Sequence, residues 1–272
     1  MEDFREWLKA NKYAESTIKE LLKVIGSLEI YYESTDLQNL RYEDLINYIE
    51  NLQGKVKAQT INQRLTGIRL YYSYLKEEGL VHHNVAQKVY VKNIKQSLPV
   101  LLKEEELENL YTNYAVNTAS ELERKILLGL LIYQGSDLGT VKNLESKDIS
   151  LDKSEIYLPG NKRMNSRRLS IKGNQILLLA RYLENREGRL FTEKKYLVNR
   201  YEWLKKDLKK LNKKVESIRQ IRSSVITNWL RTYNLREVQY YVGHKHISST
   251  EKYKRMDLEE MKSDLRKYHL LG

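Results

Sequence analysis

The amino-acid sequence predicts a mainly α-helical protein that carries one small three-stranded antiparallel sheet. Apolar residues recur every three to four positions along most of the 272 residues, which is the period of an amphipathic helix. Only two Pro and 12 Gly are present, too few for the many turns of an all-β fold. Short alternating runs occur between residues 149 and 171, where we expect the sheet. The length fits one large or two modest domains.

The first domain, residues 1–90, is expected to be a four-helix bundle. Residues 4–31 supply one or two helices, and others run from residue 42 to Gln53 and from Thr60 to Gly79. Thr17 and Thr60 are predicted as N-caps, because a hydroxyl there satisfies free N–H groups of the first turn. The apolar stripes are Ile18, Leu21, Ile25 and Leu28, then Tyr42, Leu45, Ile46 and Ile49, then Ile61, Leu65, Ile68, Tyr72 and Leu75.

A second, mixed α/β domain is expected over residues 99–272. It follows a polar stretch, residues 84–98, that suits a linker, which we set at residues 91–98. Strands are expected at 149–151, 155–158 and 168–171, with a basic hairpin tip between the last two. Helices are expected at about 103–114, 119–133, 138–144, 174–186, 196–214, 219–232 and 235–242, with a last one after Asp257.

The charge favours a polyanionic partner. Lys and Arg number 48 against 36 Asp and Glu, a net charge of +12. Residues 1–97 hold 14 basic and 13 acidic side chains, whereas residues 98–272 hold 34 and 23. A positive field of this kind gathers nucleic acid. Biased base composition is the alternative explanation, but such bias also raises Glu and does not readily produce a segregated excess.

The composition also indicates where in the cell the protein is expected. With 41% apolar and 31% charged residues, neither a disordered chain nor a membrane protein fits, and no apolar run approaches the roughly 20 residues that cross a bilayer. Zero Cys removes disulfides and thiolate metal sites. The charged N-terminus shows no signal peptide. We therefore expect a cytoplasmic, nucleoid-associated protein with no membrane partner.

Basic and amide side chains around the helix that begins near Thr60 are candidate DNA contacts, because they suit phosphates and base edges. These are Lys55, Lys57, Asn62, Arg64 and Arg69. An ordinary solvated helix face explains them at least as well. Near the hairpin tip, Arg163 and Arg167 are candidates of the same kind.

Five ordered segments carry a resemblance. They are Thr60 to Asn84, Leu98-Pro-Val-Leu-Leu-Lys103, Tyr133-Gln-Gly-Ser-Asp137-Leu-Gly-Thr140, Ile218-Arg219-Gln-Ile-Arg222, and Val242-Gly-His244 to Tyr253. Together they resemble the tyrosine recombinases, the phage integrase and Xer-type family. The first looks like the family's core-binding domain and the second like the start of its catalytic domain. The other three stand where the family has its first box, its second box and its nucleophile.

The resemblance implies two domains that clamp duplex DNA between them. It implies a site-specific recombinase that cleaves one strand through a 3′-phosphotyrosine and passes the free 5′ hydroxyl to a partner duplex within a homotetramer. Accessory DNA-bending proteins are candidate partners. In the family a C-terminal helix docks on a neighbouring protomer, and docking on its own domain is the alternative here. The stripe for this contact is Leu258, Met261, Leu265 and Tyr268.

The resemblance assigns roles to four residues. Tyr253 would be the nucleophile, although most of the 21 Tyr must be packing residues. Arg222 would grip the scissile phosphate, and His244 would hydrogen-bond it or assist proton transfer; a surface arginine and a helix-capping histidine are the alternatives. Lys162 would protonate the leaving oxygen, with Arg163 and Arg167 within reach of the same turn.

No metal or nucleotide cofactor is expected. The chain has no P-loop pattern. The pair His82-His83 and the nearby His244 and His246 stand without Cys or a carboxylate cluster, so a metal site is not predicted.

The first box departs from the family. Asp137 stands where the family has its first catalytic arginine, and Thr140 where an acidic residue is common. A carboxylate repels phosphate, and losing one such donor typically costs about 3 to 4 kcal/mol. We expect Arg219 to replace it, because Arg219 and Arg222 share one helix face, with Arg163 and Arg167 next in line. Asp137→Arg should then be tolerated or raise the rate.

Two other functions remain as hypotheses. Asp137 favours a catalytically impaired recombinase-fold protein that binds DNA or regulates an active paralogue, and a covalent protein–DNA adduct would exclude it. A relaxing topoisomerase has similar chemistry but no supporting sequence feature. The target site and the direction of the reaction leave no signature in the sequence.

Overall fold

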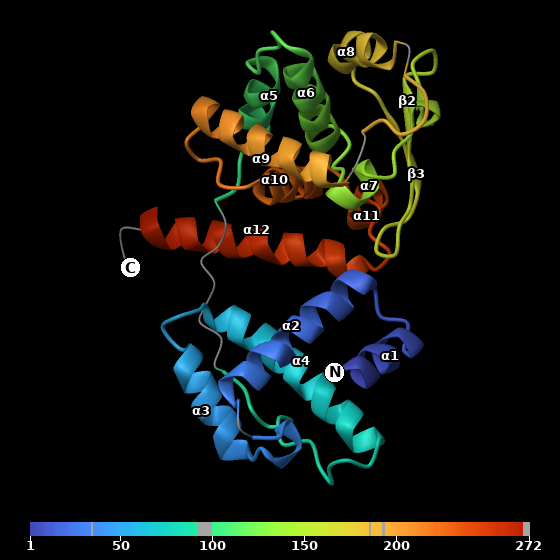
Figure 1. The fold of residues 1–272 in the computed structure, drawn as a ribbon. Coiled ribbons are helices and arrows are strands. Elements are labelled where there is room, and N and C mark those ends of the chain that lie inside the picture. The colour runs from blue at the N-terminus through green and yellow to red at the C-terminus, as the bar shows by residue number, and fades with distance from the viewer. Residues whose placement is uncertain (34, 92–99, 185, 192–193, 269–272) are drawn as a thin grey trace. The chain divides into compact units, whose positions relative to one another are not determined.

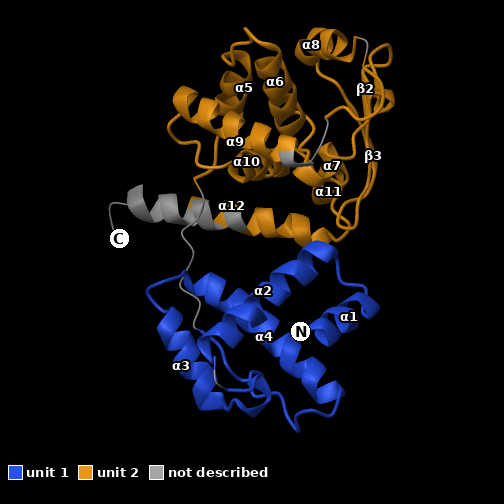
Figure 2. Cartoon of the chain, in the orientation of Figure 1, with its two compact units in different colours: residues 1–96 blue, residues 97–272 orange. Residues whose placement is uncertain are grey.

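The computed structural model describes residues 1–33, 35–91, 100–184, 186–191 and 194–268 (Figure 1). The chain divides into two compact units, residues 1–96 and 97–272 (Figure 2). The expected linker, residues 91–98, lies outside the described residues except for Val91. The fold class predicted from the sequence is confirmed: a helical N-terminal unit precedes a helical unit with one three-stranded antiparallel sheet.

The N-terminal unit contains four α-helices and a short 3-10 helix within its described residues. The elements are α1 (Glu2–Ala10), α2 (Glu15–Tyr31), η1 (Leu37–Asn39), α3 (Tyr42–Leu52) and α4 (Ala58–Glu77). Their apolar stripes meet in one core, in which Phe4, Ile25 and Tyr72 are fully buried. The Tyr72 hydroxyl donates to the Leu37 carbonyl at 2.6 Å, so η1 is held on the bundle.

Both threonine caps are wrong. The helix α2 begins at Glu15 with Ala14 as its N-cap, which places Thr17 inside the first turn. The helix α4 begins at Ala58 after Lys57, so Thr60 is also helical. In α2, the earlier start brings the carboxylate of Glu15 into the first turn, where the helix dipole favours negative charge.

The segment after α4, whose polar composition suits a linker, packs into this core. Ala86 and Val89 are fully buried. The Arg69 guanidinium donates to the carbonyls of both residues, at 3.3 and 2.5 Å. Asn62 donates to the Val91 carbonyl at 3.0 Å. The stretch is therefore packed against the helices, although its polar composition suggests a linker.

In the C-terminal unit, the three strands come between two groups of helices in the order of the sequence. The elements are α5 (Glu104–Thr112), α6 (Ala119–Ile132), α7 (Leu138–Val141), η2 (Ser146–Asp148), β1 (Ile149–Ser150), β2 (Glu155–Leu158), β3 (Arg167–Ser170), α8 (Gly173–Leu183), α9 (Lys194–Leu211), α10 (Ile218–Thr232), α11 (Leu235–Val242) and α12 (Ile247–Tyr268). The strand order is β1-β2-β3, and Leu158 pairs with Arg167 in the register of β2 and β3.

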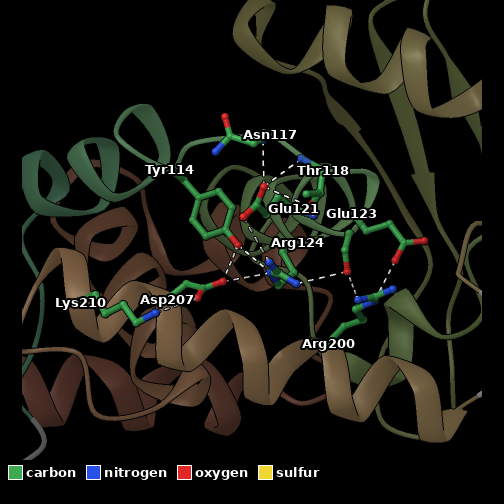
Figure 3. Close-up of polar contacts among 10 residues, drawn as sticks. Tyr114, Asn117, Thr118, Glu121, Glu123, Arg124, Arg200, Asp207 and Lys210 are labelled. Carbon is green, nitrogen blue, oxygen red and sulfur yellow. Dashed lines mark hydrogen bonds and ion pairs between the residues drawn. The ribbon is translucent and has the colours of Figure 1, made fainter.

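Helix α6 is the centre of this unit. It packs against α5, α8, α9 and α10, and Leu127 and Leu128 are fully buried. Polar side chains also join α6 to α9 (Figure 3). Arg124 pairs with Asp207 at 3.0 Å, and Arg200 pairs with Glu123 at 2.9 Å. These partly buried ion pairs hold α9 in one position against α6.

The last helix starts earlier than the sequence predicts. Helix α12 begins at Ile247 rather than after Asp257, so Tyr253 is helical. The polar run Ser248-Ser249-Thr250 conceals this start, because such residues usually favour turns. Gly243 ends α11 with φ 80°, a left-handed conformation that glycine adopts without steric cost. The reversal needs only the few residues between Gly243 and Ile247.

Candidate active site

Arg222 lies on α10, whose start is set by Ser217. The Ser217 hydroxyl accepts from the Gln220 amide at 3.1 Å and caps the helix. One face of α10 is buried in the core through Ile221 and Val225. Partly buried Arg222 donates through Nε to the Gly135 carbonyl at 2.8 Å. Its Nη2 is buried and has no hydrogen-bond partner within the described chain.

His244 follows the left-handed Gly243 and is 5% exposed. Its Nδ1 lies 2.9 Å from the Thr250 hydroxyl. Burial, together with the charges of Arg222 and Arg167, lowers the pKa of His244 to about 4, while Asp137 acts in the opposite direction. The imidazole is therefore neutral at pH 7, with Nε2 left for other partners.

Tyr253 lies on α12 beside His244. The two rings stack with centroids 6.0 Å apart and planes at 14°. The partly buried Tyr253 packs against a small cluster of Ile226, Val238 and Val242. The tyrosine and the histidine therefore lie side by side. Both interact electrostatically with Arg222: its charge lowers the pKa of His244, and Tyr253 raises the pKa of Arg222.

The hairpin between β2 and β3 reaches the same place. Lys162 and Arg163 are exposed at its tip. Met164 forms an isolated bridge with His244, and the Asn165 amide donates to the Gly243 carbonyl at 2.7 Å. The hairpin tip is therefore attached to the turn that carries His244, within the catalytic unit.

Arg167 differs from the other arginines of the hairpin. It was expected near a solvent-exposed tip, but its side chain is buried, at 3% exposure. Its Nε donates to the Tyr241 carbonyl at 2.6 Å. Burial and the charge of Arg222 lower the pKa of Arg167 to about 10, while Asp137 acts in the opposite direction. The sequence indicates the burial of Arg167, because Arg167, Leu169 and Ile171 are two residues apart and therefore lie on the same face of an extended strand.

Asp137 caps α7 rather than standing alone. Its Oδ1 accepts from the Thr140 amide at 2.8 Å. Its negative charge raises the pKa of both Arg167 and Arg222, so the carboxylate acts as a countercharge for two buried guanidinium groups. The sequence alone indicates only that this carboxylate would repel a phosphate.

Tyr201, on α9, is a neighbour that the sequence does not single out among 21 Tyr. Its side chain is 8% exposed, and its hydroxyl has no hydrogen-bond partner within the described chain. Burial raises the pKa of Tyr201, with Asp137 acting in the same direction and Arg222 against it. The ion pairs of Figure 3 fix α9 and thereby hold Tyr201 at the site.

The remaining candidates are dispersed. Arg219 is exposed in the first turn of α10, and its charge is the smallest of the causes that act on the pKa of Arg222. In the N-terminal unit, Lys55 and Lys57 are exposed, whereas Arg64 approaches the Tyr48 hydroxyl at 3.5 Å. Asn62 and Arg69 bond to backbone carbonyls, as described above.

Arg222, the neutral His244 and Tyr253 lie beside a hairpin whose tip carries Lys162 and Arg163, and this arrangement can bind a phosphate group and present a tyrosine hydroxyl to it. The model of the phage integrase family matches residues 101–260, and that of the phage integrase N-terminal SAM-like domain matches residues 1–81. The chain belongs to the phage integrase family.

Relatives match over nearly the full length. Tyrosine recombinase XerA of Pyrococcus horikoshii is 26% identical, with 100% of this chain and 94% of the relative covered. Tyrosine recombinase XerC of Bacillus subtilis is 22% identical, with 98% and 94% covered. XerH recombinase bound to a palindromic difH substrate has the same fold, with a TM-score of 0.73, 18% identity, and 94% and 81% covered. In the described part of the chain, no helix has the length and apolar character that crossing a membrane requires.

Proposed function

We propose that this protein is a site-specific DNA recombinase that cleaves and rejoins DNA through a 3′-phosphotyrosyl intermediate at Tyr253. The observation that carries the proposal is the stacking of Tyr253 on His244 beside Arg222. Membership of the phage integrase family and the full-length match to tyrosine recombinases support it.

In the proposed cleavage step, the Tyr253 hydroxyl oxygen bonds to the scissile phosphorus while the bond from phosphorus to the 5′ oxygen breaks. The phosphodiester is exchanged for a phosphotyrosine, so bond energy is preserved for rejoining. Arg222 binds a non-bridging oxygen through Nη2, which has no hydrogen-bond partner among the residues that the structure describes. Lys162, exposed at the hairpin tip, gives its proton to the leaving 5′ oxygen.

Neutral His244 has two uses that depend on its tautomer. If the Thr250 hydroxyl donates to Nδ1, then Nε2 carries the proton and donates to a phosphate oxygen, and the proton of Tyr253 passes to solvent. If Nδ1 donates to Thr250 instead, Nε2 accepts the proton that Tyr253 loses. In both cases Thr250 orients the ring. The first use keeps the histidine neutral and agrees with its lowered pKa, whereas the second makes it cationic, which burial and Arg222 disfavour.

The DNA contacts proposed for the N-terminal unit rest on exposure. Lys55 and Lys57 are exposed and suit phosphates. Arg64, Asn62 and Arg69 contribute only if they release or share their present partners. Arg163 extends the basic surface at the hairpin tip. Each phosphate contact should add about 0.9 to the log–log slope of affinity against salt, so several contacts predict a steep loss of binding as salt rises.

We further propose assembly into a homotetramer on DNA through the C-terminal helix. Leu258 and Met261 of α12 are 50% and 54% exposed. Leu265 and Tyr268, the rest of the expected stripe, have side chains outside the described residues. A lambda integrase of the same fold, with a TM-score of 0.73 at 12% identity, was solved as a dimer bound to a core site. Accessory DNA-bending proteins are proposed as additional partners.

The alternative is a regulatory DNA-binding protein without cleavage activity, which Asp137 favours if the first-box arginine has no replacement. Trapping separates the two functions. The purified full chain is incubated with fragmented host DNA, denatured, and examined for covalent protein–DNA adducts that are then sequenced. We expect adducts at defined positions. Sequence-specific retention without any adduct would support the regulatory function instead.

A further inference from the structure

The site contains an anchored arginine, Arg222, and the resemblance to the tyrosine recombinases implies a second arginine at the position where this chain has Asp137. Nε of Arg222 is already used on the Gly135 carbonyl, and a second cation would add to the stabilisation of the charge on the two non-bridging oxygens of the transition state. The chain must therefore supply another cation or cleave slowly. The following inference rests on the proposed function and concerns this second cation.

We propose that Arg167, on β3, is the second arginine that binds the scissile phosphate. Its Nη1 and Nη2 are both buried and have no hydrogen-bond partner among the described residues. Its Nε is fixed on the Tyr241 carbonyl at 2.6 Å, so the guanidinium keeps one orientation. A phosphate oxygen would satisfy the two nitrogens that the protein leaves free.

Arg167 and Arg222 are held in the same way. Each uses Nε to donate to a backbone carbonyl and leaves terminal nitrogens unpaired. The carbonyl that holds Arg222 belongs to Gly135, two residues before Asp137, and the one that holds Arg167 belongs to Tyr241, three residues before His244. Arg222 lowers the pKa of Arg167, so the two positive charges repel each other, and a phosphate anion bound by both would relieve that repulsion.

Gly243 makes room for Arg167. A Cβ atom at this position would lie 2.5 Å from Nη1 of Arg167 and 2.9 Å from the Asn165 carbonyl oxygen. Glycine therefore serves both the left-handed turn before His244 and the approach of Arg167 to that turn. This close approach brings the β3 arginine to the element that positions His244.

The cost of this arrangement points to a ligand. Buried polar groups in proteins are nearly always hydrogen-bonded, and a buried charge is costly unless it is paired. Asp137 offsets part of the charge of Arg167 but occupies its own cap with Thr140. An exposed arginine such as Arg219 or Arg163 bears no such cost and needs no ligand.

Asp137 thereby gains a different role from the one expected. It caps α7 and counterbalances the two arginines when DNA is absent. Replacing it with arginine would put a third cation beside two buried ones. Asp137→Arg should therefore lower activity and stability, contrary to the expectation from sequence.

The first test measures anion binding without cleavage. Melting temperatures of the full chain are compared in inorganic phosphate and in chloride at equal ionic strength. We expect phosphate to raise the melting temperature of the wild type and of Arg181→Met, an exposed arginine on α8. Arg167→Met should fold, melt at or above the wild type in chloride, and lose most of the phosphate increment. An unchanged increment in Arg167→Met, or none in the wild type, would overturn the inference.

The second test uses a DNA fragment recovered by adduct trapping. Arg167→Met and Arg222→Met should each slow adduct formation by about 10² to 10³, and Arg219→Met should slow it less. A methylphosphonate at the cleaved position removes one negative charge, so it should bring Arg167→Met back towards the wild-type rate. Loss of folding alone would not be rescued in this way.

The same measurements can instead identify Arg219 as the second arginine. If Arg167→Met cleaves normally while Arg219→Met is as slow as Arg222→Met, Arg219 is the second arginine and the inference is wrong. If the wild type forms no adduct on any DNA, the proposed function fails, and the phosphate measurement still decides whether Arg167 binds the anion.

Discussion

The ring of Tyr253 stacks on the ring of His244, with centroids 6.0 Å apart. Thr250, whose hydroxyl lies 2.9 Å from Nδ1 of the same histidine, stands three residues before Tyr253 on α12. Residues three apart share a helix face. One face of α12 therefore both orients the histidine and presents the tyrosine, and the helix begins before both residues, at Ile247.

Tyr253→Phe should abolish covalent adducts while leaving duplex binding within a few fold, because the ring still packs but the attacking oxygen is gone. Adducts are measured on denaturing gels and binding by mobility shift. Tyr90→Phe, at a tyrosine that is 78% exposed in the other unit, is the control and should retain the adduct. Persistence of the adduct in Tyr253→Phe would show that another residue is the nucleophile.

Acid should destabilise the catalytic unit through His244. Its folded pKa, about 4, lies below the unfolded value near 6.5. Its contribution is therefore full above pH 6.5 and is lost as pH falls towards 4, by up to about 3 kcal/mol. Urea unfolding of the wild type and of His244→Gln at pH 7 and pH 5 measures this. The variant should lose less stability on acidification, and equal losses would assign the effect to other groups.

Gly243→Ala should be more damaging than an ordinary glycine substitution. The left-handed turn alone costs an alanine about 1–2 kcal/mol. Gly188→Ala is the matched control, because its φ is 76° and a Cβ there meets nothing within 4 Å. We expect Gly243→Ala to destabilise the protein further and to slow adduct formation, since the added carbon displaces Arg167. Equal stability of the two variants, with normal cleavage, would show that Arg167 has room to move.

Truncation after Arg255 should reduce assembly on DNA more than binding to a single site. The deletion removes the exposed Leu258 and Met261 together with the rest of the stripe, but keeps Tyr253. Sedimentation on DNA that carries one or two sites measures the difference. Equal loss of both activities would indicate that the segment docks on its own domain.

Much of the fold is determined by local pattern. The bounds predicted for the helix over 235–242 agree with α11, and the three strands were placed within a residue or two of β1, β2 and β3. These elements have strong periodicity and clear ends such as Gly243. The predicted starts of α2, α4 and α12 were wrong, because several polar residues near a helix start can serve equally well as its N-cap.

The sequence by itself determined the helical class, the two parts of the chain and the order of Arg222, His244 and Tyr253, because these follow from periodicity and short spacings. Only the tertiary structure decided that Arg167 is buried against the turn that carries His244. Arg167 meets the Tyr241 carbonyl across 74 positions of the chain, and its burial follows from the pairing of β3 with β2 and from the turn at Gly243. A contact of that range depends on how separate elements pack, and local sequence does not encode it.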